Sequence, residues 1–247
     1  MKRVLVAGVA IVFAAVMLVG ASGCTPGSQA TTGNTTKSVA APAAAKPVVD
    51  LIWSRVGKNV GQPQVEFVIR VTNPGNTSAD GVATTVEALD KSGTIVGSTD
   101  VVMPSIAAGA TFDYFGTIGG TAFSSLTGTP DKVEMQAVTS AGSAAPAPLQ
   151  TSELKLTKTK PGMNFGDTKY SYDFTVKVTN STDQPITGGV HQQIVLYDSA
   201  GKPVGGGEGS SDNVPSSLAP GSSYREQWTG AGAIAPVSSA KYAVWVQ

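Results

Sequence analysis

Cysteine and histidine are almost absent from this chain of 247 residues, which contains one of each. A single cysteine cannot form a disulfide within the chain, so the fold must be stabilised by packing alone. One histidine, His191, and one cysteine cannot complete a zinc site of the usual ligands. We therefore expect no metal site and no cofactor.

A large charge of either sign is also missing. The chain has 17 Lys and Arg residues against 17 Asp and Glu residues. Removing residues 1–23 takes away Lys2 and Arg3 and no acid, which leaves 15 basic and 17 acidic residues and a net charge near −2. So weak a charge provides no basic surface for nucleic acid or anionic lipid. Binding to nucleic acid is not expected.

The only cysteine, Cys24, follows a segment with the features of a signal peptide. Two basic residues precede an uncharged run over 4–23, and residues 21–23 are all small, as at a cleavage site. The segment resembles the lipobox of bacterial lipoproteins, with Ala21 where leucine is usual. The resemblance implies a signal peptide over 1–23, lipidation (palmitate-type acylation) of Cys24, and a protein anchored on the extracytoplasmic face of the cell membrane.

Two alternatives stay open for the same segment. Residues 4–23 are long enough to span a bilayer, so they could form an uncleaved anchor. They could also be an ordinary signal peptide of a secreted protein. Residues 24–47, rich in Thr, Ala and Pro, follow without hydrophobic periodicity. We predict that this segment is a disordered tether.

The rest of the chain contains a duplication. Segments of the first part recur about 107 to 112 residues later, separated by small insertions. The matching pairs are 67–73 with 174–180, 88–90 with 196–198, and 106–109 with 218–221. The repeat predicts two homologous domains over 48–140 and 150–247, joined by an Ala/Pro/Ser linker over 140–149.

Each copy is typical of β-strands. In 170–179 an apolar residue alternates with a polar one, and 65–71 repeats the pattern, as in a strand buried on one face. Asn73 and Asn180 end these strands as turn residues, and glycine-containing hairpins are predicted at 90–93 and 198–201. The fold class predicted is all-β, with two tandem Ig-like antiparallel β-sandwich domains.

The second copy carries a recognisable motif. V-T-N at 178–180, I-V-L-Y-D at 194–198 and L-A-P-G at 218–221 together resemble the FxLYD domain of bacterial lipoproteins, and the first copy is a more degenerate version. The resemblance implies an Ig-like sandwich on a surface lipoprotein. It carries no functional residues over to this chain.

Few residues are candidates for chemistry. His191 neighbours Val190 in an alternating strand, so we expect it to face outward into solvent. Gly206, Gly207, Glu208 and Gly209 belong to a glycine-rich segment without the Lys-Ser/Thr ending of a phosphate loop. We predict an enlarged hairpin loop over 205–217, with these residues forming its binding site.

A calcium site formed by Glu208 and residues 210–213 is a weaker alternative, because the spacing matches no calcium loop. Tryptophans at three positions are expected in the core rather than as binding anchors. They are Trp53, Trp228 and Trp245.

These observations predict a non-catalytic surface protein without catalytic residues. It would bind an envelope protein or a glycan, or act as a spacer, while its N-terminal lipid attaches it to the membrane. The alternative is an extracytoplasmic hydrolase with loop carboxylates, which requires two acids about 5–9 Å apart in a cleft.

Overall fold

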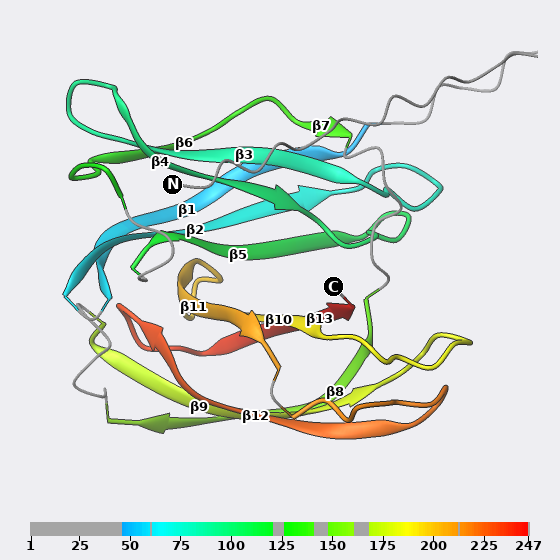
Figure 1. Ribbon diagram of the computed structural model, residues 1–247. Helices are drawn as coiled ribbons and strands as arrows, with labels where there is room; N and C mark the ends of the chain where they lie inside the picture. Colours follow the sequence, from blue (N-terminus) through cyan, green and yellow to red (C-terminus); the bar gives the residue numbers. More distant parts are fainter. Residues whose placement is uncertain are drawn as a thin grey trace, which may run out of the picture. The chain divides into compact units, whose positions relative to one another are not determined.

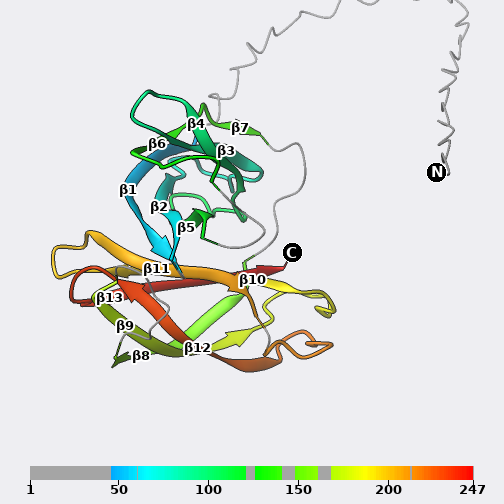
Figure 2. The same ribbon diagram turned by 60° about the vertical axis from the view of Figure 1, so that its left-hand side comes forward.

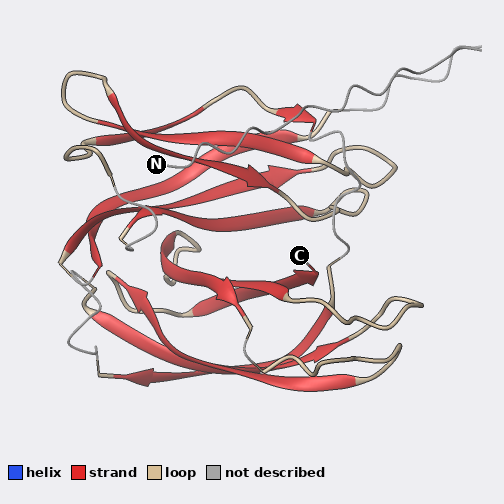
Figure 3. Cartoon of the chain, viewed as in Figure 1, coloured by secondary structure: helices blue, strands red, loops and turns tan. Residues whose placement is uncertain are grey.

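The computed structural model describes residues 46–59, 61–120, 126–140, 148–160, 168–211 and 213–246 (Figure 1). Every regular element in these ranges is a β-strand, so the predicted all-β class is confirmed (Figure 3). No helix long and apolar enough to cross a membrane occurs in this described part. Cys24, the predicted signal peptide and the tether up to residue 45 lie outside the described residues.

The first half of the described chain, residues 46–140, forms two antiparallel sheets. One sheet has the order β1-β2-β5, and the other has β3 between β4 and the pair β6 and β7. The strands are β1 (Val48–Asn59), β2 (Gln62–Thr72), β3 (Val82–Leu89), β4 (Ile95–Val102), β5 (Thr111–Gly119), β6 (Lys132–Met135) and β7 (Thr139–Ser140).

The second half, residues 148–246, repeats this pairing. Strands β8-β9-β12 correspond to β1-β2-β5, and β11-β10-β13 correspond to β4-β3-β6. Only here are the two layers joined, because β11 pairs with β12 through Gly205 and Gly206. The strands are β8 (Gln150–Thr159), β9 (Tyr170–Thr179), β10 (Val190–Tyr197), β11 (Pro203–Ser210), β12 (Ser223–Ala233) and β13 (Ser239–Val246).

Four layers of strands lie on one another, with apolar clusters between them (Figures 1 and 2). One cluster fills the first half and a second fills the second half. A third lies where β1-β2-β5 faces β10-β11-β13, a contact that we call the junction. It contains Trp53, Val68, Phe115, Val195 and Tyr197. Residues 43–247 form one compact unit, so the division into two domains stays a prediction.

The strand periodicity predicted from the sequence is observed. Val65, Phe67, Ile69 and Val71 of β2 have no exposed surface and point into the first core. Phe174, Val176 and Val178 of β9 occupy the same place in the second core. Burial of these side chains is the main favourable term for each half, since each contributes roughly 1.5–3 kcal/mol when removed from water.

The repeated asparagines have the predicted turn role. Asn73 Nδ2 donates to the carbonyls of Thr77 and Ile106 at 2.8 and 3.0 Å. Asn180 Nδ2 donates in the same way to Gln184 and Leu218 at 2.8 and 2.9 Å. Each asparagine therefore ties the end of its strand to a later segment of the same half, which leaves its buried amide satisfied.

The predicted hairpins are also confirmed. In both, the glycine N–H donates to the carbonyl of the aspartate three residues earlier, at 3.0 Å in 90–93 and 3.1 Å in 198–201. Gly93 and Gly201 have φ angles of 84° and 75°, which glycine adopts without a Cβ clash.

The predicted linker over 140–149 is too long at its C-terminal end. Leu149 is buried in the second core, and Pro148 forms a bridge with Trp245 of β13. The large aliphatic side chain of Leu149 can be removed from water there, whereas a linker would leave it exposed. Residues 141–147 lie outside the described residues.

Candidate functional site

A groove of about 290 Å³ lies along the junction, where β1, β2 and β5 face β11 and β12. Both halves of the chain line it. Its polar and aromatic side chains include Lys58, Asn59, Gln64, Glu66, Thr117, Glu208 and Trp228. The predicted binding residues Gly206, Gly207 and Glu208 also line this groove, while Gly209 lies farther along β11, against Trp228.

The predicted loop at these glycines is wrong over residues 205–210, which belong to strand β11. A Cβ on Gly206 would lie 2.3 Å from the Ile194 carbonyl oxygen and 2.6 Å from Phe115 Cδ2. On the other face, Cβ atoms at Gly207 and Gly209 would lie 3.4 Å from the Trp228 ring. The glycines therefore permit close packing on both faces of a strand, which composition alone cannot distinguish from a loop.

Glu208 is the acidic side chain that β11 places at the groove. Its carboxylate accepts hydrogen bonds from Thr117 Oγ1 at 2.9 Å and Tyr114 OH at 3.5 Å, both on β5. Only 19% of its side-chain surface is exposed. Burial raises the pKa of Glu208 to about 7, although the hydrogen bonds from Thr117 and Tyr114 oppose the shift.

His191 is not the solvated residue that its strand pattern predicts. The outer face of β10 is covered by the first half, so the imidazole is enclosed although it points away from its own core. Its ring lies against Trp245, with centroids 4.6 Å apart. Nε2 is buried without a hydrogen-bond partner among the described residues, and burial lowers the pKa of His191. Its Nε2 lies 3.7 Å from Glu208 Oε2.

A second acid, Glu66, lines the groove from β2. Its carboxylate accepts two hydrogen bonds from Arg55, at 2.6 Å from Nη2 and 3.2 Å from Nε. Glu66 lies directly opposite Thr117 in the β2–β5 register, and Thr117 donates to Glu208. The groove thus has one ion-paired carboxylate and one buried carboxyl group whose described hydrogen-bond donors are neutral.

Asp113 on β5 holds the junction together. Its fully buried carboxylate accepts hydrogen bonds from Arg70 of the first half and, in the second half, from Tyr197 OH at 2.5 Å and Lys241 Nζ at 2.7 Å. Burial opposes its ionisation, but these donors outweigh burial and lower the pKa of Asp113 to about 2.

Gln193 of β10 satisfies the backbone of β5 at the same place. Its Nε2 donates to the Asp113 carbonyl at 2.7 Å, and its Oε1 accepts from the Phe115 N–H at 2.8 Å. The side-chain amide thus makes the hydrogen bonds to the β5 backbone that a neighbouring strand would otherwise make. These bonds position the two walls of the groove relative to each other.

The tryptophans divide between the junction and the groove. Trp53 and Trp245 are 8% and 6% exposed, as expected of core residues, but both lie at the junction rather than inside either sandwich. Trp228 is half-buried and lines the groove, with its ring packed against Phe174 at 5.7 Å between centroids. Trp228 is therefore available for contact with a ligand.

Two residues of the calcium alternative have another partner, because Ser211 Oγ and Asn213 Nδ2 donate to Glu226. Asp212 lies outside the described residues, so the alternative stays a prediction. Within the described ranges, no group of three or more His, Cys, Asp or Glu residues is placed to hold a metal ion.

The sequence predictions do not identify the junction between the two copies, although a comparison of the copies would have indicated it. By strand register, Val195 corresponds to Glu87, and Phe115 corresponds to Gln227. Some strand residues that point away from their own core are apolar in one copy and polar in the other. The apolar member of each pair lies on the sheet face that contacts the other half. The polar copies, Glu87 and Gln227, face outward on the two outermost layers.

Comparisons with known proteins add little. No protein family matches the sequence, and no curated protein matches it. Among solved structures, red sea bream transglutaminase is similar at 12% identity and a TM-score of 0.23. The match covers 79% of this chain and 28% of that protein, so this chain spans less than a third of its length. A TM-score this low supports neither a fold assignment nor an activity.

Proposed function

We propose that this protein is a non-catalytic, lipid-anchored envelope protein that binds a glycan in the groove at the junction. The observation behind the proposal is the chemistry of the groove walls. Trp228 offers an aromatic surface, Asn59 and Gln64 offer amides that both donate and accept, and two carboxyl groups accept hydrogen bonds. This combination suits a sugar, which has apolar C–H faces and many hydroxyl groups.

The size of the groove favours a glycan segment over a folded protein partner. A volume of about 290 Å³ is at the lower end for small-ligand pockets. A stable protein–protein interface buries roughly 1,200–2,000 Å², far more than the walls of this groove provide. A protein partner would therefore have to bind elsewhere, on a sheet edge or an outer face.

The anchoring part of the proposal is based on the sequence. The lipobox-like residues 21–24 and the Thr-, Ala- and Pro-rich segment that follows would hold the folded part away from the membrane, where it can reach the polysaccharides of the envelope. The FxLYD-like motif agrees with such a location.

Absence of catalysis is proposed because both groove acids are already engaged. Arg55 occupies the carboxylate of Glu66, while Thr117 and Tyr114 hold that of Glu208. A hydrolase is the alternative function, because two acids line the same groove and a glycosidase needs such a pair.

Co-sedimentation of the detergent-solubilised protein with insoluble envelope polysaccharide tests both functions. We expect Gln64→Ala to weaken binding, while Gln136→Ala, on an exposed residue directly after β6, should leave it unchanged. Retention of the wild-type protein with no release of reducing ends supports the proposal. Release of reducing ends that depends on Glu208 would instead establish the hydrolase, and equal sedimentation of both variants would place binding outside the groove.

A further inference from the structure

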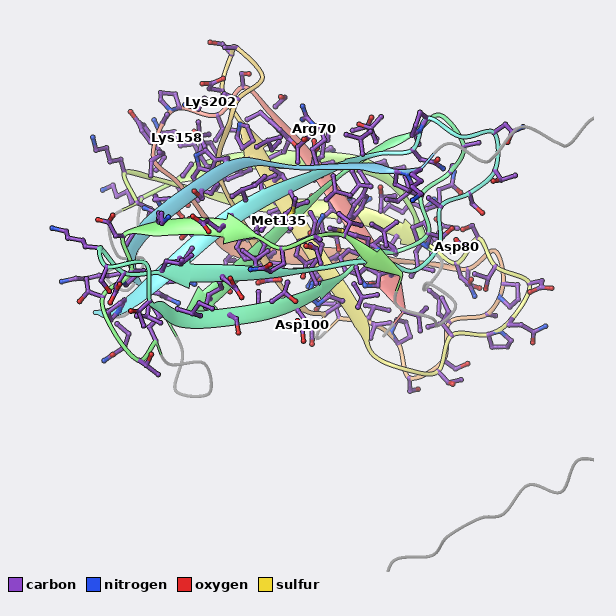
Figure 4. The ribbon with its side chains drawn as sticks, turned by 90° about the horizontal axis from the view of Figure 1, so that it is seen from above. Arg70, Asp80, Asp100, Met135, Lys158 and Lys202 are labelled. Atoms are coloured by element: carbon purple, nitrogen blue, oxygen red, sulfur yellow. The ribbon has the colours of Figure 1, made fainter. Side chains whose placement is uncertain are left out.

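The two copies of the repeat place the same acidic position in opposite environments. Glu208 pairs with Gln193, and its counterpart Asp100 pairs with Thr85. Asp100 is exposed on the sheet formed by β3, β4 and β6 (Figure 4), where Thr85 Oγ1 donates to it at 2.7 Å. Glu208 is instead covered by β5. Asp100 is therefore a matched, solvent-exposed control for the buried Glu208 within the same chain.

Charged and titratable groups face Glu208 from several strands. Tyr114 reaches it from β5 and His191 from β10, while Glu66 of β2 and Lys58 of β1 lie on the walls of the groove. Strand β12 contributes Trp228, which does not titrate. No Lys or Arg of the described residues forms an ion pair with Glu208, so an ionised Glu208 has only neutral donors beside the imidazole.

The imidazole and the carboxyl group are placed to share a proton. His191 and Glu208 lie diagonally across the β10–β11 pair, since His191 is opposite Ser210 and Glu208 is opposite Gln193. The separation of 3.7 Å between Nε2 and Oε2 is slightly longer than a hydrogen bond, and Nε2 has no other described partner. A small rotation of either side chain would close the gap.

We propose that His191 and Glu208 form a proton-binding pair that regulates ligand binding in the groove, an inference that rests on the proposed function. With the proton bound to Glu208, the groove presents a neutral carboxyl group and the contact between β5 and β11 is intact. Loss of the proton leaves a carboxylate whose described donors, Thr117 and Tyr114, are neutral hydroxyl groups. Hydroxyl groups of a glycan then supply further donors, because hydrogen bonds to an ionised acceptor are stronger than those to a neutral one.

The two groups affect stability in opposite directions as the pH changes. The pKa of Glu208 is raised from 4.5 in the unfolded chain to about 7, so its stabilising effect is complete below pH 4.5 and is lost as the pH rises through 7. From well below pH 4.5 to well above pH 7, the unfolding equilibrium constant should rise about 300-fold from this group. Burial lowers the pKa of His191 below 6.5, so its contribution is present above pH 6.5 and is lost as the pH falls.

Since His191 is the only histidine, its imidazole resonances can be assigned without ambiguity in the full-length chain in detergent. We expect them to show one inflection near pH 7, from ionisation of Glu208, and a separate protonation below pH 6.5. Glu208→Gln should remove the inflection near pH 7, and Asp100→Asn should leave both unchanged. One titration near 6.5 that is the same in wild type and Glu208→Gln would overturn the proposal, and it can be measured without any ligand.

Denaturation between pH 4.5 and 8 provides the second measurement. Relative to wild type, Glu208→Gln should become more stable as the pH rises, whereas the Asp100→Asn difference should stay flat. A flat difference for Glu208→Gln would refute the proton-linked role. If these results hold but envelope polysaccharide does not bind more tightly at pH 8 than at pH 5.5, the pair exists and the proposed ligand is wrong.

Discussion

Replacing Asp113 by asparagine should weaken the junction by an amount that follows from its pKa. The substitution keeps the size of the side chain and removes the charge that accepts hydrogen bonds from Arg70, Tyr197 and Lys241. A pKa of about 2 in the folded chain, against 3.8 in the unfolded chain, corresponds to about 2 kcal/mol of stability at neutral pH.

The solvent exposure of Arg70 and Lys241 keeps the stability lost on Asp113→Asn below that of a fully buried ion pair. Removing one member of a fully buried ion pair typically costs 3–5 kcal/mol, because the remaining charge is left without solvent. Here the side chains of Arg70 and Lys241 are 36% and 57% exposed, so water can solvate both after the substitution. We therefore expect about 2 kcal/mol rather than about 4 kcal/mol for Asp113→Asn.

Urea denaturation followed by tryptophan fluorescence is the appropriate assay, because Trp53 lies in the junction cluster. The stabilisation by Asp113 is present above pH 3.8 and is lost as the pH falls through 2, since its folded pKa is depressed. The variant and the wild type should thus differ by about 2 kcal/mol at pH 7 and converge towards pH 2.5. A difference that is absent at pH 7, or unchanged at pH 2.5, would refute this reasoning.

Further predictions concern the junction and the anchor. Gly206→Ala should destabilise the protein by about 1–3 kcal/mol in a thermal melt, because its Cβ would overlap Ile194 and Phe115, whereas Gly188→Ala has nothing within 4 Å and should be neutral. Val195→Glu, which introduces the residue found in the other copy, should bury an unpaired charge and open the junction to limited proteolysis between the halves. Cys24→Ala should abolish the acylated N-terminus detected by mass spectrometry in the wild type and leave an unprocessed precursor; an intact Met1 in the wild type would support the uncleaved anchor.

Local sequence was sufficient for those features that depend on neighbouring residues. The alternation in 65–71 and 170–179 identifies two strands and their buried faces, because successive side chains of a strand point to opposite sides. The asparagine turns and the glycine hairpins follow from residues within a few positions of each other. The duplication extends this information to most of the pairing scheme, since the pairs within β1-β2-β5 and β4-β3-β6 recur in the second copy, which adds the β11–β12 pair.

Tertiary structure alone decided what covers the outer faces. The alternation in β10 indicates which side chains enter its own core, but it cannot show that β5 from the other copy covers the opposite face. This covering makes His191 and Glu208 buried groups rather than solvated ones, and it explains why a glycine run forms a strand rather than a loop. Burial and the pKa shifts that it causes depend on groups distant in sequence, so a periodicity read along one strand contains no record of them.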